Sequence, residues 1–300
     1  MKRLRQISMI VCALSVFVYG IYRIYCFRAT DKFGPVIEME DNEISVSIGS
    51  DEDTLLEGVT ATDSKDGNVT DSLVVESISK FLKNNKKIVT YAAFDSNNHV
   101  GKATREVTYE DYSSPKFSTK RPFRFPVNTT DFISEVKAKD CIDGDISDKV
   151  KISPGYSIVT DTPGDYKIQL QVANSSGDVE YLPVTVEIYD PTNNMITPDI
   201  QLKKYIVYTT IDKKVNPKDY IKKVMIGGGS YKMTSGSGTY KKETPTAGGK
   251  LSYQSIHIDD KKVNYEKAGT YEITYSMTVD KKYEGTTRLI VVVRDEAGED

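Results

Sequence analysis

The most constraining feature of the sequence is a thirteen-residue pattern that occurs twice. It begins at Asp63 and again at Asp140, and reads D-x-x-D-G-[ND]-[VI]-[ST]-D-x-[LV]-x-[VI] with a spacing of 77 residues. A pattern repeated at a fixed interval indicates similar structural units placed one after another along the chain. The 300 residues therefore fit two or three domains better than one.

Segments typical of β-strands follow each copy of the pattern. Val89, Tyr91 and Ala93 alternate with other residues in the first repeat, and residues 166–172 do the same in the second. The last third of the chain lacks D-x-x-D-G, but residues 269–277 match residues 164–172. Short alternating runs rich in Val, Ile, Tyr and Thr, separated by turn residues, predict β-sandwiches.

The order of these features resembles the bacterial surface immunoglobulin-like repeats of Gram-positive exported proteins. The resemblance rests on an opening proline in each unit (Pro35, Pro115 and Pro198), the D-x-x-D-G turns and the G-x-Y strands. It covers residues 34–190 well and residues 191–300 only at their two ends. It implies a sandwich fold and a cell-surface location, but it does not imply one ligand.

We therefore predict an all-β protein made of tandem immunoglobulin-like β-sandwiches after an N-terminal transmembrane helix. Each sandwich is expected to have its own core, and Tyr166 and Tyr271 are expected to pack inward. The predicted ranges are 1–29 for a cytoplasmic tip and signal-anchor, 30–112 for domain 1, 113–190 for domain 2, and 191–300 for a divergent domain 3 with an inserted loop at 227–250.

The N-terminal segment predicts a single membrane span. Three basic residues precede an apolar run over residues 7–27 that only Arg23 interrupts, and Arg23 can reach the headgroups. The positive-inside rule places the N-terminus in the cytoplasm and the later domains outside the cell. A cleaved signal peptide is the alternative, although bulky Tyr22 and Tyr25 make a poor cleavage site.

The stretch from Gly227 to Lys250 is rich in Gly, Ser, Thr and Lys. Such a composition predicts a long loop between strands, because it offers little apolar surface to bury. Two alternatives are a ligand-binding loop and a hairpin formed by residues 230–233 and 238–241.

The repeated pattern also supplies oxygen ligands of the kind that Ca²⁺ prefers. Its spacing is not that of the EF-hand loop. Asp-Gly is itself a strong turn signal, so a plain hairpin turn without metal is the favoured interpretation. The candidate calcium ligands are Asp63, Asp66, Asn68 and Asp71 in the first copy, and Asp140, Asp143, Asp145 and Asp148 in the second.

Other chemistry finds little support in the sequence. The chain has two histidines, His99 and His257, and three cysteines, of which Cys141 stands alone after the N-terminal segment and is expected to be a small buried hydrophobe. Residues 30–112 have 8 basic and 17 acidic side chains, and no later segment is basic enough to suggest nucleic acid. We expect no enzyme and no cofactor, Ca²⁺ aside.

The function that follows is a non-catalytic, membrane-anchored cell-surface protein, acting as a spacer or interaction module of the cell envelope. The expected partners are the lipid bilayer, through residues 7–27, and an envelope protein or a glycan. The alternatives are an adhesin or glycan-binding protein that uses the 227–250 loop, and an accessory subunit of a membrane complex.

Overall fold

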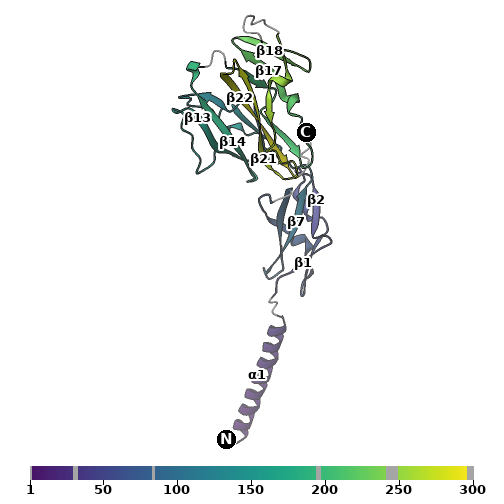
Figure 1. Cartoon of the computed structure of the whole chain (residues 1–300). Coiled ribbons are helices and arrows are strands. Elements are labelled where there is room, and N and C mark those ends of the chain that lie inside the picture. The colour runs from purple at the N-terminus through teal and green to yellow at the C-terminus, as the bar shows by residue number, and fades with distance from the viewer. Residues whose placement is uncertain (1, 30–32, 83–84, 194–196, 241–248, 296–300) are drawn as a thin grey trace. The chain divides into compact units, whose positions relative to one another are not determined.

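The protein is described from a computed structural model that covers residues 2–29, 33–82, 85–193, 197–240 and 249–295. One long N-terminal helix precedes a chain built mainly of β-strands (Figure 1), which confirms the predicted all-β sandwich fold. The chain forms two compact units, unit 1 (Met1–Asp111) and unit 2 (Tyr112–Asp300).

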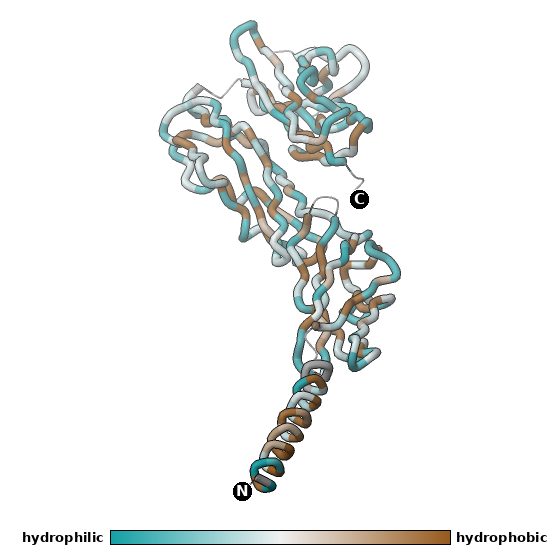
Figure 2. The backbone as a smooth tube through the Cα atoms, turned by 90° about the horizontal axis from the view of Figure 1, so that it is seen from below, coloured by the Kyte–Doolittle hydropathy of each residue, from teal (hydrophilic) through white to brown (hydrophobic). Residues whose placement is uncertain are grey.

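Helix α1 (Lys2–Ala29) is apolar along most of its length, as the brown tube in Figure 2 shows. Its segment Arg3–Tyr25 is long and apolar enough to cross a membrane, judged by length and composition. Among the described residues, none of that segment is buried.

The rest of unit 1 is a sandwich of two sheets, ordered β1-β3-β4 and β2-β7-β6-β5. Alternate residues of β3 and β6 face inward, as the period-two pattern predicts. The elements are β1 (Val36–Met39), β2 (Glu43–Val46), α2 (Glu52–Leu56), β3 (Val59–Asp63), β4 (Gly67–Asn68), the 3₁₀ turn η1 (Thr70–Ser72), β5 (Val74–Ile78), β6 (Lys86–Phe94) and β7 (Val100–Tyr109).

Unit 2 begins with a sandwich of similar plan, with sheets ordered β11-β10-β8 and β12-β13-β14-β9. Its elements are β8 (Lys116–Thr119), β9 (Arg124–Pro126), β10 (Val136–Asp140), β11 (Gly144–Asp145), η3 (Ser147–Lys149), β12 (Lys151–Ile152), β13 (Gly164–Ala173) and β14 (Val179–Tyr189), followed by the turn η4 (Pro191–Asn193).

A second sandwich completes unit 2, with sheets ordered β15-β17-β18-β19 and β16-β22-β21-β20. Its elements are β15 (Asp199–Leu202), β16 (Ile206–Thr210), η5 (Pro217–Tyr220), β17 (Ile221–Ile226), β18 (Gly229–Thr234), β19 (Gly249–Ser252), η6 (Tyr253–Ser255), β20 (His257–Asp259), β21 (Gly269–Val279) and β22 (Tyr283–Arg294).

In all three sandwiches a short strand near the start pairs in parallel with the long last strand. These pairs are β2 with β7, β9 with β14, and β16 with β22. The third pair is the longest and runs from Ile206 opposite Ile290 to Thr210 opposite Arg294.

In each sandwich of unit 2, one tyrosine fixes the loop that leads into the penultimate strand. The Tyr166 hydroxyl donates to the Thr162 carbonyl, and the Tyr271 hydroxyl donates to the Lys267 carbonyl, both at 2.9 Å. Both rings are half-buried and pack against the cores. A tyrosine bonded to backbone a few residues upstream is the tyrosine corner of immunoglobulin-like sandwiches.

The two sandwiches of unit 2 share buried apolar surface. Ile206, Ile290 and Val292 belong to the same cluster as the core of residues 117–188, whereas Leu289, Val291 and Val293 belong to the core of the last sandwich. Strand β22 is therefore buried on both faces. The expected single core per sandwich does not describe this pair, because one sheet of the second sandwich packs against the first.

Arg294, at the end of β22, adds polar contacts across this shared interface. Its guanidinium donates to the Glu180 carboxylate at 2.9 Å and to the Pro115 carbonyl at 2.9 Å. It also lies 4.7 Å from the centre of the Tyr208 ring. Tyr208 in turn accepts a hydrogen bond from the Phe117 backbone N–H at 2.6 Å. The ion pair is largely withdrawn from water, with Arg294 19% and Glu180 23% exposed.

The opening proline of a sandwich passes directly over a glycine in two cases. A Cβ on Gly101 would lie 1.8 Å from the Pro35 carbonyl oxygen, and a Cβ on Gly285 would lie 1.7 Å from the Pro198 carbonyl oxygen. No side chain fits at either position without moving the backbone.

The glycine-rich stretch at 227–250 contains regular structure that composition did not predict. Gly227 and Gly228 have positive φ and turn the chain from β17 into β18, where Tyr231 is buried opposite Val224. The alternative hairpin between 230–233 and 238–241 is wrong, because β18 pairs with β17 and β19 instead. The remainder of the predicted loop, residues 241–248, lies outside the described residues.

Candidate functional site

The first Asp of each repeated motif closes a turn with its own backbone. Asp63 Oδ1 accepts from the N–H groups of Lys65 and Asp66 at 2.7 and 2.8 Å. Asp140 Oδ1 accepts from the N–H groups of Ile142 and Asp143, both at 2.9 Å. These are Asx-turns, in which a side-chain oxygen replaces a backbone acceptor.

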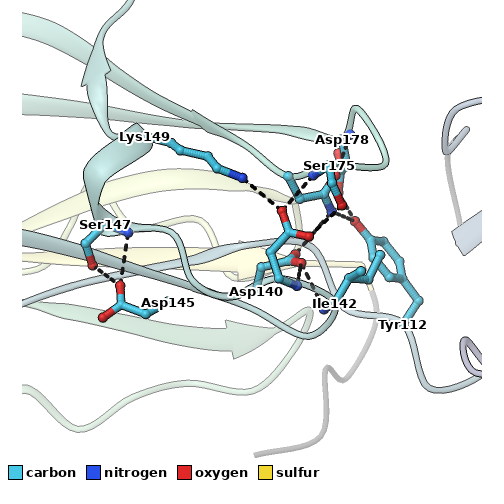
Figure 3. Close-up of polar contacts among 10 residues, drawn as sticks. Tyr112, Asp140, Ile142, Asp145, Ser147, Lys149, Ser175 and Asp178 are labelled. Carbon is cyan, nitrogen blue, oxygen red and sulfur yellow. Dashed lines mark hydrogen bonds and ion pairs between the residues drawn. The ribbon is translucent and has the colours of Figure 1, made fainter.

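The second Asp of the motif ties this turn to the hairpin of the opposite sheet. Asp66 Oδ2 accepts from the Ser96 N–H at 2.8 Å, between β6 and β7. Asp143 accepts from the Ser175 N–H at 2.7 Å and from the Ser175 hydroxyl at 2.5 Å, between β13 and β14 (Figure 3). We refer to these contacts as the end clasp, because they join the two sheets at one end of the sandwich.

A buried polar network extends the end clasp in unit 2. Asn174 Nδ2 donates to Asp140 Oδ2 at 3.1 Å and to the Tyr112 hydroxyl at 2.9 Å (Figure 3). The Tyr112 hydroxyl donates to Asp178 at 2.5 Å. Burial raises the pKa of Tyr112, and the Asp178 carboxylate raises it further. Tyr112 and Asn174 lie outside the repeated motif, so the motif alone did not reveal them.

The remaining members of the two motifs separate into two groups. Asn68 Oδ1 accepts from Thr70 N–H at 2.9 Å, and Asp145 Oδ1 accepts from Ser147 N–H at 3.0 Å, so both cap the following 3₁₀ turn. Asp71 and Asp148 are exposed and point to no described partner. In neither motif, therefore, does the described structure gather the four predicted ligands around one point.

The donors around these carboxylates are a poor match for a metal ion. Asp143 receives an N–H, a hydroxyl and the Lys149 ammonium group, the last at 3.0 Å. Hydrogen-bond donors aimed at carboxylate oxygens occupy the lone pairs that Ca²⁺ would need. Within the described ranges no group of three or more His, Cys, Asp or Glu side chains is arranged to hold a metal. Calcium binding stays a prediction, to be measured as the change in Tm between calcium and EDTA.

Replacing Asp143 with Ala is expected to lower the Tm of unit 2 by several degrees, because the charge-assisted bonds from Ser175 and Lys149 disappear together. Asp148→Ala removes the same charge from an exposed position in the same motif and is the matched control. Calorimetry of both variants in calcium-free buffer makes the comparison. Equal Tm values would contradict a structural role for the end clasp.

The end clasp and the Asp turns beside it also predict an acid-labile fold. Backbone N–H groups of Asp66 and Lys65 hold the pKa of Asp63 below its usual value, and Ser175 and Lys149 lower the pKa of Asp143. Burial would raise the pKa of Asp95, but hydrogen bonds from His99 and Asn97 keep it low.

Because these folded-state pKa values lie below the unfolded value of about 3.9, the unfolded state binds more protons in this range. Their contribution to stability is fully present above about pH 4 and is lost as the pH falls through the folded values. Calorimetry across this range should show a constant Tm above about pH 5 and a falling Tm below about pH 4. A Tm that falls equally in Asp143→Ala would assign the acid sensitivity to other groups.

The residues considered for other chemistry are His99, His257 and Cys141, and their contacts belong to the fold. His99 Nδ1 lies 2.7 Å from the Asp95 carboxylate within the turn that Asp95 caps. His257 is exposed on β20. The expectation of a buried Cys141 is wrong, since its side chain is exposed and its Sγ contacts the backbone of Ser113. The motif turn holds Cys141 at the surface.

No family model matches the chain. Over 168 residues the chain is 28% identical to an uncharacterized 81.3 kDa protein of Acholeplasma phage L2, a match that covers 56% of this chain and 20% of the phage protein. The matched segment thus spans a fifth of the length of that relative.

Two of the solved structures with some likeness come from a bacterial protein and a protocadherin. One holds the CBM51-2 domain in complex with GlcNAc and the INT domains of Clostridium perfringens ZmpB, at 18% identity and a TM-score of 0.21, covering 49% of this chain and 26% of that one. Another is the protocadherin GammaB4 extracellular domain, at 13% identity and a TM-score of 0.19, covering 88% and 50%. Likenesses this low carry no inference about ligand or partner.

Proposed function

We propose that this chain is a membrane-anchored surface protein whose sandwiches form a non-catalytic interaction module or spacer of the cell envelope. The observation that carries the proposal is the apolar segment Arg3–Tyr25, which spans 23 residues and is not buried by the part of the chain that the structure describes. At 1.5 Å per residue it measures about 34 Å, enough to cross a hydrocarbon core of about 30 Å.

The charge around this helix supports an orientation with the sandwiches outside the cell. Lys2, Arg3 and Arg5 precede the apolar segment, and basic residues favour the cytoplasmic side. An uncleaved helix would leave the protein attached to the membrane at its N-terminus.

The use of the polar side chains supports a non-catalytic role. The carboxylates of Asp63, Asp66, Asp140 and Asp143 accept hydrogen bonds from the backbone, so their lone pairs serve the fold. In the described part of the chain, His99 is bonded within a turn and His257 lies on an exposed strand surface. A general base needs a nucleophile within hydrogen-bond reach. Hydrolysis of cell-wall polymers by the purified chain would contradict this role.

The exposed thiol of Cys141 provides a direct test of anchoring and orientation. The variant Cys12→Ser/Cys26→Ser leaves Cys141 as the remaining thiol of three. A membrane-impermeant maleimide should label it in intact cells, and the labelled chain should stay in the membrane fraction after alkaline washing. The triple variant that also carries Cys141→Ser should not be labelled.

Two results would overturn the proposal. Labelling only after cell lysis would reverse the orientation. A labelled chain that is shortened at its N-terminus and released into the medium would establish a cleaved signal peptide.

A further inference from the structure

A polar groove of about 400 Å³ lies between the two sandwiches of unit 2. The first sandwich contributes the β8–β9 turn and the end of β14, and the second contributes β15 and β17. The side chains that matter for the argument are Lys120, Arg121, Arg124, Tyr189, Gln201 and Lys222. The groove is separate from the end clasp and from the 227–250 stretch.

The charge of the groove is strongly one-sided. Four cationic side chains line it, and Asp199 is the acidic residue among the lining residues. Arg121 pairs with Glu135 at 3.3 Å and Arg124 with Glu187 at 3.0 Å, and both of these glutamates lie outside the lining. The positive charge of the side chains that line the groove is thus only partly neutralised.

Lys120 and Lys222 are the two ammonium groups left without a counter-ion. Neither has a carboxylate within 4.0 Å in the part of the chain that the structure describes, and both are exposed. One belongs to each sandwich, so an anionic ligand that bridged the groove would contact both. The shared core and the Arg294 contacts hold the two walls together.

The uncharged groups of the groove favour a hydroxyl-rich ligand. Tyr189 is half-buried beneath the Arg124 guanidinium, which lies 4.1 Å from its ring centre. Gln201 donates to Asp199 at 2.8 Å and keeps a carbonyl oxygen available as an acceptor. Leu202 and Tyr205 are buried, so the groove presents mainly polar groups. A volume of this size accommodates a small ligand or a short segment of a polymer.

We infer that this groove binds a short segment of an acidic glycan, in which carboxylates contact Lys120 and Lys222 and sugar hydroxyls contact the uncharged groups. This inference rests on the proposed surface location for its biological meaning, but not for its measurement. A nucleic acid fits less well, because it requires a longer basic stripe than one groove with four cations.

The test uses the full chain in a neutral detergent and a fluorescein-labelled pentagalacturonate, with binding followed by fluorescence anisotropy. The methyl-esterified oligomer is the neutral probe, and polyphosphate and oligothymidylate are the competing polyanions. The variant is Lys120→Gln/Lys222→Gln. The matched control is Lys151→Gln/Lys261→Gln, which removes two exposed lysines of unit 2 outside the groove.

We expect saturable binding that weakens with salt, little binding of the ester, and a loss of about tenfold in affinity in the groove variant. The control variant should bind as the parent chain does. No binding of pentagalacturonate, or an equal loss in both variants, would overturn the inference. Tighter binding of polyphosphate or oligothymidylate would overturn the assignment to a carboxylated glycan. Because binding is measured on purified protein, its failure is distinguishable from a failure of the Cys141 labelling.

Discussion

Replacing Arg294 with Met is expected to lower the free energy of unfolding of unit 2 by about 2–4 kcal/mol. Met keeps most of the apolar contact with Tyr208 but removes the cation that faces Glu180. The Glu180 carboxylate is then left in a largely buried place without its partner. Leaving a buried charge unpaired lowers the free energy of unfolding by more than the ion pair added to it. The single variant should therefore be markedly unstable.

The pH dependence identifies the cause. Burial raises the pKa of Glu180, and Arg294 opposes that rise. Without Arg294 the folded-state pKa lies further above the unfolded value, so the protonated form of Glu180 favours folding. The instability of Arg294→Met should therefore be largest near pH 7.5 and smaller near about pH 5. The double variant Glu180→Gln/Arg294→Met should recover part of the lost stability at the higher pH.

Two outcomes would contradict this account. One is a loss of stability that does not change with pH, which would assign the effect to packing against Tyr208. The other is a double variant no more stable than the single one, since the explanation requires an unpaired carboxylate. Chemical denaturation of the detergent-solubilised chain measures both.

Replacing Gly285 with Ala is expected to destabilise unit 2 by about 1–3 kcal/mol, the usual cost of inserting atoms into a filled space. The added Cβ would lie 1.7 Å from the Pro198 carbonyl oxygen, a backbone atom that cannot rotate away. Either the opening segment of the second sandwich or strand β22 must move. Because β22 is buried on both faces, its displacement would disturb both clusters of unit 2.

Gly236→Ala is the matched control in the same unit. Its Cβ would lie 3.7 Å from Thr234 Oγ1, an ordinary contact at an exposed position, so it should change stability by less than about 0.5 kcal/mol. Gly101→Ala repeats the experiment in unit 1, where Cβ would meet the Pro35 carbonyl oxygen at 1.8 Å. If Gly285→Ala and Gly236→Ala had the same stability, the close passage of the proline over the strand would be disproved.

The sequence pattern predicted the sandwiches because period-two alternation and turn residues are local signals. The D-x-x-D-G turn could also be predicted from the sequence, because the Asx-turn at Asp63 or Asp140 involves only neighbouring backbone groups. The contact of Asp143 with Ser175 joins residues 32 positions apart and depends on the packing of two sheets. The motif therefore contains no local signal from which Ser175, Asn174 or Tyr112 could be predicted as its partners.

The shared core of unit 2 does have a local signal in the sequence. Residues 289–293 read Leu-Ile-Val-Val-Val, without the alternation seen in the other long strands. A continuous apolar run is typical of a strand buried on both faces, and β22 is such a strand. The groove between the two sandwiches could not be predicted, because Lys120 and Lys222 line one groove only when the two sandwiches pack together.

The parallel pairing of the opening and last strands has a mechanical consequence for a chain held at its N-terminus. A pull along the chain enters each sandwich through β1, β8 or β15 in one sheet, then reaches β2, β9 or β16, and leaves through β7, β14 or β22. Such a pull slides two parallel neighbours past each other, so their hydrogen bonds share the load instead of opening one after another. The five-residue pair of β16 with β22 gives the last sandwich the longest such joint. If the chain is anchored as proposed, tension would therefore meet shear resistance in each of the three sandwiches.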